Sequence, residues 1–253
     1  MPRLSVCIEM FWRDLPVAER IPRVAALGYP AFEFWGWKNK DIPKVRAAVD
    51  ACGLPVAALA FEPGGSLIRR GAQAELVQGM RDTAAIAQGL GCRTVIITAG
   101  NRLDDEPDEA SRRRVVRHLA AVGRIAEDHG LTLVLEPLNT LVDHAGYWLR
   151  TMAQAVDIVE GVGSPAVKIL MDLYHQGIQE GNVINNLTAY IDHIGHFHAA
   201  GLPGRHELVG GEQDYRAILR AIDATGYSGH VGLEYRPLLD PEESLRQALS
   251  LVE

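Results

Sequence analysis

The sequence predicts an α/β protein that folds as one (β/α)8 TIM barrel domain over residues 1–253. Its 253 residues, 47% of them hydrophobic, match the ~250 residues of a typical eight-unit barrel. Short β-rich runs alternate with longer helical patterns, without a linker, a low-complexity tract or a change in composition. Four successive strand-like runs in the second half each end in a side chain that can bind a metal, and the C-terminal ends of parallel strands share one rim in such a barrel.

Eight runs predict the strands in order. RLSVCI (3–8), AFEFW (31–35), PVAALA (55–60) and RTVIIT (93–98) come first, followed by 131–136, 166–172, 194–199 and 229–234. Val, Ile and Leu dominate the last four runs, which is typical of parallel strands that helices cover on both faces.

Helical patterns fill the intervals between these runs. They lie near 16–27, 41–52, 73–90, 108–129, 148–160, 184–191, 213–225 and 241–252. Gly28, Gly53, Gly91, Gly130 and Gly226 follow helical patterns shortly before the next strand, where glycine commonly ends a helix. The connections that precede the strands are therefore short and those that follow them are long, which places function after the strands.

An open Rossmann sheet is the main structural alternative. Such a sheet needs a G-x-G-x-x-G turn after its first strand, and here that position holds Glu9, Met10, Phe11 and Trp12. Other glycine pairs, at 64–65 and 161–163, lack this spacing and are interpreted as turn glycines. The barrel is therefore favoured.

Charge and cysteine content exclude several classes of function. The 32 acidic and 25 basic residues give a net charge of -7, so no nucleic-acid partner is expected. Cys7, Cys52 and Cys92 lack C-x-x-C spacing and predict free thiols in a reducing compartment. No apolar stretch of ~20 residues and no signal-like N-terminus stands out. We expect a cytoplasmic protein without a membrane partner, and a homo-oligomer remains open.

The four strand-end side chains are Glu136, Asp172, His198 and Glu234. Three carboxylates in one cleft repel one another unless protons or a cation relieve the charge. Oxygen ligands with one imidazole favour Mn²⁺ or Mg²⁺, and Co²⁺ or Zn²⁺ also remain open. For one such acid, capping of a helix or pairing with an arginine is the simpler explanation, but four on successive strands favour a shared site.

Two further histidines lie near these strand ends. His175 follows Asp172 by three positions, and His196 lies two positions before His198. Alternation along a strand sends His196 and His198 to the same side, and His198 is closer to the rim. His175 is a candidate substrate contact, and for each the alternative is a hydrogen-bonded structural histidine.

Several longer stretches resemble the hydroxypyruvate isomerase family, a branch of the xylose isomerase-like TIM barrels that also includes tagatose and psicose 3-epimerases and endonuclease IV. The stretches cover almost the whole chain: EFWGWKNKD (33–41), TAGNR (98–102), LEPLNTLVDHAGY (135–147), ILMDLYHQGIQEGN (169–182), PGRHELVGGEQDY (203–215) and GHVGLEYRP (229–237).

The resemblance implies isomerisation through an enediolate, with Glu136 and Glu234 as the acid/base pair. It implies that Asp172 and His198 complete a metal site with them. By the same resemblance His175 and Arg205 contact the substrate, and Glu212 matches a recurrent family glutamate whose alternative is a loop-bracing acid. Relatives that act on hydroxypyruvate often carry glutamine where this chain has His198, whereas ketose 3-epimerases carry histidine.

Residues after the earlier strands are candidates for closing over a small polar ligand. Glu9, Trp12 and Trp35 are expected as pocket walls, against the alternative that they cap the core. Asn101 is a candidate polar substrate contact, against the alternative that it braces its loop.

The leading hypothesis is a metal-assisted isomerase that converts hydroxypyruvate to tartronate semialdehyde, with a small hydroxy-carbonyl molecule as its partner. A cation that binds two neighbouring substrate oxygens stabilises the charge that forms when a proton leaves the adjacent carbon. The alternatives are a ketose 3-epimerase of the tagatose, psicose or ribulose type, an endonuclease IV-like phosphodiesterase, and a non-catalytic sugar-binding barrel.

Overall fold

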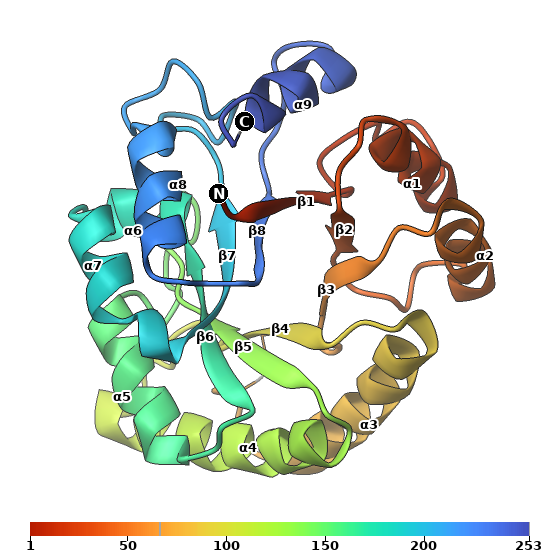
Figure 1. Cartoon of the computed structure of the whole chain (residues 1–253). Helices are drawn as coiled ribbons and strands as arrows, with labels where there is room; N and C mark the ends of the chain where they lie inside the picture. The colour runs from red at the N-terminus through yellow and green to blue at the C-terminus, as the bar shows by residue number, and fades with distance from the viewer. Residues whose placement is uncertain (66, 253) are drawn as a thin grey trace.

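The computed structural model describes residues 1–65 and 67–252. Eight parallel strands close into a barrel in sequence order, β1 to β8, and β8 pairs with β1. The helices surround the strands on the outside (Figure 1). The predicted (β/α)8 TIM barrel is therefore confirmed.

The strands are β1 Arg3–Cys7, β2 Ala31–Phe34, β3 Val56–Ala60, β4 Thr94–Thr98, β5 Thr132–Glu136, β6 Val167–Asp172, β7 Ile194–Ala199 and β8 His230–Leu233. The helices are α1 Val17–Ala26, α2 Ile42–Cys52, α3 Gln73–Leu90, α4 Asp108–Asp128, α5 Met152–Val162, α6 Leu173–Gln179, α7 Val183–Ala189, α8 Tyr215–Ala224 and α9 Pro241–Leu249, with a 3₁₀ turn at Ile191–His193.

All eight predicted strands are present, and the five glycines predicted to end helices have positive φ angles. Two helix predictions needed correction. The fifth helix begins at Met152 rather than at 148, because Trp148 N donates to Gly100 O and Thr151 caps the helix by accepting from Gln154 N. Helix α6 was not predicted, and it begins directly after β6, where Asp172 caps it.

Two layers of inward-facing side chains fill the end of the barrel where the strands terminate. The inner layer has an apolar half, in which Ala58, Ile96, Val134 and Leu170 from β3 to β6 form a small cluster. The main core lies between the strands and the surrounding helices. The layer nearer the rim carries the strand-end acids, because side chains two positions apart on a strand face the same way.

Two predictions about the environment of the chain can be compared with the structure. Cys7, Cys52 and Cys92 are free thiols, as expected. Within residues 1–65 and 67–252, no helix has both the length and the hydropathy needed to cross a bilayer.

Candidate metal centre and active site

Glu136, Asp172, His198 and Glu234 converge at the C-terminal end of the barrel. Each offers a ligand atom, and these four atoms lie within 4.8 Å of one another. Glu136 ends β5, Asp172 ends β6 directly beside His198 of β7, and Glu234 follows β8. All four residues are buried, with 1–7% of their surface exposed. The expected meeting of four strand ends therefore occurs in the fold.

The two carboxylate oxygens of Asp172 have different roles, one in capping a helix and the other in the shared site. Oδ1 accepts hydrogen bonds from the backbone N–H groups of Tyr174, at 2.8 Å, and His175, at 3.1 Å, and so caps helix α6. Oδ2 is buried without a hydrogen bond and lies 3.5 Å from Nη2 of Arg205. Helix capping and participation in the shared site are therefore compatible in this residue.

The Glu234 carboxylate is held from several sides. It accepts a hydrogen bond from Nε1 of Trp35 and forms an ion pair with the Arg205 guanidinium. His198 Nδ1 lies 3.3 Å from Oε2. Burial alone would raise the pKa of Glu234, but the positive charges of Arg205 and His198 hold it well below its usual range. Glu234 is therefore an ionised acid in a fixed position.

The Glu136 carboxylate is in the opposite situation. Within the described part of the chain it accepts no hydrogen bond, and the nearest cationic group is Nδ1 of His198, 3.8 Å away. Burial raises the pKa of Glu136 to about 8, against the lowering effect of His198, and the charges of Glu234 and Asp172 add to the rise. This acid can therefore carry a proton near neutral pH.

His198 connects the quartet to a carboxylate that the sequence did not single out. Its Nε2 lies 2.7 Å from Oε1 of Glu33, which is 1% exposed in β2. Burial would lower the pKa of His198, but Glu234 and Glu33 together raise it well above the ordinary value. The sequence feature that could have identified Glu33 is an acidic residue within the otherwise apolar strand Ala31–Phe34.

The donor set fits a divalent cation. Three carboxylates and one imidazole are hard to borderline ligands that suit Mn²⁺ or Mg²⁺. Asp172 Oδ2 and His198 Nδ1 are buried and lack hydrogen bonds, and a cation would satisfy both. It would also relieve the repulsion that raises the pKa of Glu136.

Three members of the quartet, Glu136, His198 and Glu234, border a cavity of about 400 Å³. Trp35, His175, Arg205 and Arg236 also line it. Asn139 Nδ2 lies 2.6 Å from Nδ1 of His175, and an amide nitrogen can only donate, so the His175 proton sits on Nε2. Burial lowers the pKa of His175 and favours this neutral form. His175 Nε2 is buried without a hydrogen bond and can donate to a ligand.

Two of the candidate pocket walls lie outside this cavity. Glu9 forms an ion pair with Lys40, at 2.6 Å, and accepts from the backbone N–H of Trp35. Trp12 is 9% exposed and packs against Phe11 in the core. Glu9 therefore braces the residue that does line the cavity, Trp35, and Trp12 contributes to packing.

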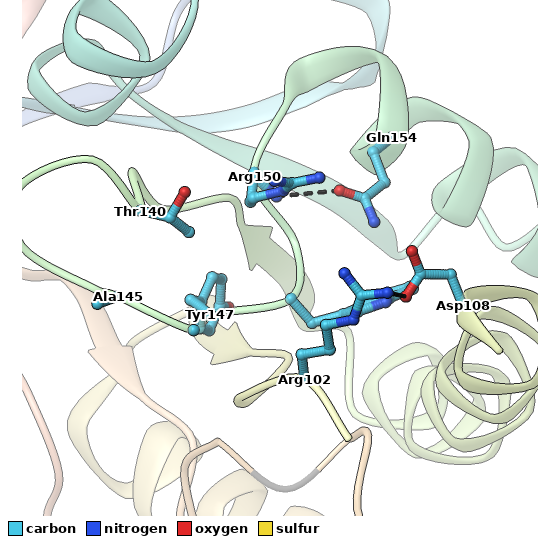
Figure 2. A pocket seen from close by; sticks show the side chains of 9 residues that line it. Arg102, Asp108, Thr140, Ala145, Tyr147, Arg150 and Gln154 are labelled. Carbon is cyan, nitrogen blue, oxygen red and sulfur yellow. Dashed lines mark hydrogen bonds and ion pairs between the residues drawn. The ribbon is translucent and has the colours of Figure 1, made fainter. Parts of the chain in front are cut away.

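Asn101 and Glu212 also lie away from the quartet. Asn101 pairs with Tyr147 through an isolated β-bridge, and the next residue, Arg102, forms an ion pair with Asp108 at the edge of a separate cavity of about 280 Å³ (Figure 2). Glu212 is exposed in a groove beside α7 and α8. Neither side chain borders the cavity that Glu136, His198 and Glu234 line.

Comparisons with known proteins agree with this architecture. The family model described as xylose isomerase-like TIM barrel matches residues 21–253. A protein named 2-oxo-tetronate isomerase from Cupriavidus necator is 31% identical over 94% of this chain and 94% of its own length. A protein named hydroxypyruvate isomerase from Escherichia coli is 26% identical over 97% of this chain and 98% of its own length.

Solved structures share the fold closely. A protein described as AP endonuclease, family 2, from Brucella melitensis superposes with a TM-score of 0.94 at 25% identity, over 99% of each chain. A D-allulose 3-epimerase from Methylomonas superposes with a TM-score of 0.79 at 18% identity, over 99% of this chain and 91% of its own, and this likeness shows the fold alone.

Proposed function

The chain belongs to the xylose isomerase-like TIM barrel family, and from this premise we propose that it is a metal-assisted isomerase of small 2-oxo acids. Hydroxypyruvate, converted to tartronate semialdehyde, is the leading substrate. The relatives named hydroxypyruvate isomerase and 2-oxo-tetronate isomerase support this class of reaction. The three free cysteines support a reducing compartment, and we place the enzyme in the cytoplasm.

The convergence of Glu136, Asp172, His198 and Glu234, three of which line the cavity, is the observation that carries the proposal. These four residues would hold a divalent cation, Mn²⁺ or Mg²⁺. When bound, such a cation polarises the carbonyl group of a substrate and stabilises the negative charge that develops on it. Glu136 and Glu234 would then act on the substrate in the same buried place in which the cation is held.

Glu136 is our candidate for the group that moves the proton. Its carboxylate is not held by hydrogen bonds from the described residues, and its burial, which a bound cation does not remove, raises its pKa and favours the protonated form that a group taking and returning a proton must reach. Glu234 is fixed by Trp35 and Arg205, so its carboxylate serves to hold charge and geometry. Removal of a proton from C3, its return to C2 and transfer of the hydroxyl proton from the C3 oxygen to the C2 oxygen together give isomerisation.

Two groups are suited to orient a substrate in the cavity. His175 offers an N–H at Nε2 to a substrate oxygen. Arg205 already pairs with Glu234 and lies close to Asp172, whereas Arg236 lines the cavity with no ion pair or side-chain hydrogen bond among the described residues. The charges of a divalent cation and of Arg205 together equal the negative charge of the three carboxylates in the quartet. The carboxylate of an acidic substrate therefore needs one more positively charged side chain. Arg236 supplies that charge, which favours a 2-oxo acid over a neutral sugar.

A ketose 3-epimerase is the second candidate, and the imidazole of His198 favours it, because the resemblance associates histidine at this place with epimerases. Epimerisation requires two proton-carrying groups that act on opposite faces of one carbon. The different environments of Glu136 and Glu234 favour one mobile proton. An endonuclease-like activity is disfavoured, because a net charge of -7 opposes binding of a phosphate backbone.

Turnover assays distinguish these functions. Purified protein is loaded with Mn²⁺ and incubated with hydroxypyruvate in one sample, and with ketopentoses and ketohexoses in D₂O in others, and the products are followed by NMR. We expect tartronate semialdehyde from the first sample and no deuterium at C3 of the sugars. Absence of the first product together with deuterium at C3 would replace the isomerase with the epimerase.

A further inference from the structure

The inner layer of the barrel is polar on one side only, directly beneath the cation-binding quartet. Ser5 of β1, Glu33 of β2 and His196 of β7 are buried there, with 0–2% of their surface exposed. The opposite half of the same layer is the apolar cluster of Ala58, Ile96, Val134 and Leu170. A buried carboxylate is costly unless its oxygens are paired, so the contacts of Glu33 require an explanation.

Glu33 Oε2 has hydrogen-bonding partners, whereas Oε1 is buried without an aligned hydrogen bond. Oε2 accepts a hydrogen bond from Ser5 Oγ at 2.9 Å and lies 3.0 Å from His196 Nε2. Oε1 lies 2.7 Å from His198 Nε2. Two contacts therefore hold one oxygen, and the other oxygen faces the imidazole of the candidate metal ligand.

The neighbouring strand leaves room for this carboxylate. A Cβ atom on Gly232 of β8 would lie 2.2 Å from Glu33 Oε1 and 2.7 Å from its Cδ. Gly232 pairs with His198 in the sheet, so the glycine opens the space in which Glu33 reaches the imidazole. Any side chain at 232 would push the carboxylate away from its present place.

The two ring nitrogens of His198 face different groups. Nε2 faces Glu33, whereas Nδ1 faces Glu234 Oε2 at 3.3 Å and Glu136 Oε1 at 3.8 Å. A histidine that binds a cation must offer a lone pair on the nitrogen that faces it, and its proton must then be on the other nitrogen. A carboxylate beside Nε2 favours the proton there.

We propose that Glu33 is a positioning residue that keeps the His198 proton on Nε2 and thereby directs the Nδ1 lone pair toward the cation. Ser5 and His196 fix the carboxylate that performs this role. The inference rests on the cation site of the proposed function but not on the identity of the substrate.

Glu33→Gln tests this role through metal binding rather than turnover. Mn²⁺ affinity of the metal-free protein is measured by isothermal titration calorimetry in wild type, Glu33→Gln and a control, Glu180→Gln, whose carboxylate contacts the backbone of Met152 outside the site. Loss of an outer partner of a metal-binding histidine weakens binding by about 10- to 100-fold. We expect a loss of this size in Glu33→Gln and an unchanged affinity in Glu180→Gln.

The protonation of His198 supplies a second measurement. In ¹⁵N NMR spectra of metal-free protein, recorded at a pH high enough to deprotonate the imidazolium of His198, we expect the remaining proton on Nε2 in wild type and a mixture of both tautomers in Glu33→Gln. If Glu33→Gln does not fold, Ser5→Ala keeps the carboxylate, removes one of its two supports and should weaken Mn²⁺ binding several-fold.

Three results would overturn the proposal. One is an affinity in a folded Glu33→Gln or Ser5→Ala variant that stays within twofold of wild type. Another is a His198 proton on Nδ1 in wild type. The third is binding of two Mn²⁺ ions by wild type with loss of one in Glu33→Gln, which would make Glu33, His196 and His198 a metal site themselves. Tight Mn²⁺ binding without hydroxypyruvate turnover would reject the proposed substrate and leave the role of Glu33 intact.

Discussion

Two glutamates of the quartet have the same side chain but different surroundings. Glu136 is not hydrogen-bonded by the described residues, whereas Glu234 is held by Trp35, Arg205 and His198. The same chemical group is thereby available to move a proton in one place and to hold charge in the other. The difference can be tested by replacing each one separately.

Glu136→Gln should lower kcat for hydroxypyruvate by about 10²- to 10⁴-fold, because it removes the proposed general base. Glu234→Gln should weaken Mn²⁺ binding as well, because it removes a held anionic ligand and leaves Arg205 without its partner. Steady-state rates at saturating Mn²⁺, with Mn²⁺ affinities measured in parallel, separate the two effects. Equal kcat losses at full metal occupancy would contradict the division of roles.

Arg236→Gln should raise KM for hydroxypyruvate by about 10-fold or more, because a charged hydrogen bond to a carboxylate contributes roughly 1.5–3 kcal/mol. Turnover of a neutral ketose, if detectable, should not change. Arg150→Gln is the matched control, because Arg150 lines the separate cavity of Figure 2. An unchanged KM in Arg236→Gln would assign carboxylate binding to another group.

Sequence patterns located the functional residues at the ends of the strands better than those deeper inside the barrel. Glu136, Asp172, His198 and Glu234 were predictable because parallel strands bring their ends to one rim. Glu33 was not identified, because its contact with His198 depends on how β2 and β7 face each other across the closed barrel, a relation that no local pattern contains.

Local sequence patterns also could not show whether the candidates after the first strand line the cavity. Glu9 and Trp12 follow β1 as predicted, but Lys40 pairs with one and the core surrounds the other. A residue at a strand end can turn toward the cavity or away from it, and the loop that follows decides which. Loop conformation depends on contacts between segments that are distant in the sequence.

At the scale of elements, strand β8 has one position where only glycine fits. Gly232→Ala should lower the free energy of unfolding by about 1–3 kcal/mol, because the added methyl group would overlap the buried Glu33 carboxylate. Gly89→Ala in α3 is the control, because its added Cβ meets nothing within 4 Å and alanine favours helix. Urea unfolding measures both, and equal stabilities would show that Glu33 can move without cost.

His230 begins the same strand, and it connects stability to pH. Burial, with the charge of Arg3, lowers the pKa of His230 to about 4, whereas the unfolded chain binds this proton near the ordinary value of 6.5. The unfolded state therefore binds more protons between pH 6.5 and 4, and stability falls as pH falls through this window. The ring is partly exposed, so we discount the effect to about 1 kcal/mol.

His230→Gln should remove this contribution. Unfolding free energies of wild type and variant, measured by urea titration from pH 7 to pH 4, should differ progressively as the pH falls, with the variant less sensitive. Parallel curves would contradict the assigned burial effect, whereas a constant offset between them would reflect packing alone.

Helix α6 illustrates how an element escapes prediction. It has seven residues and contains Gly177, so it shows little helical periodicity. Asp172 caps it with the oxygen that does not face the quartet. A single side chain thus starts a helix and contributes to the site, and the sequence pattern of β6 revealed only the second role.

At the scale of the whole molecule, the barrel closes on itself and brings strands from both halves of the chain together. The quartet lies in or directly after β5 to β8, whereas of the two residues that contact it Glu33 lies in β2 and Trp35 follows that strand. The site therefore requires a complete ring of strands. Anything that binds the quartet should stabilise the native fold as a whole.

Mn²⁺ should raise the melting temperature of the protein by roughly 5–10 °C at a free concentration of about 100 times its Kd. Linkage at this saturation contributes about 2.7 kcal/mol, and each kcal/mol shifts the midpoint by about 2–4 °C in a domain of this size. Asp172→Asn separates ligation from capping, because asparagine also caps helices. Its melting temperature in EDTA should stay near that of wild type, while most of the Mn²⁺-dependent rise should disappear. Differential scanning calorimetry with EDTA or Mn²⁺ measures both, and superimposable wild-type curves would argue against a cation held by the four strand ends.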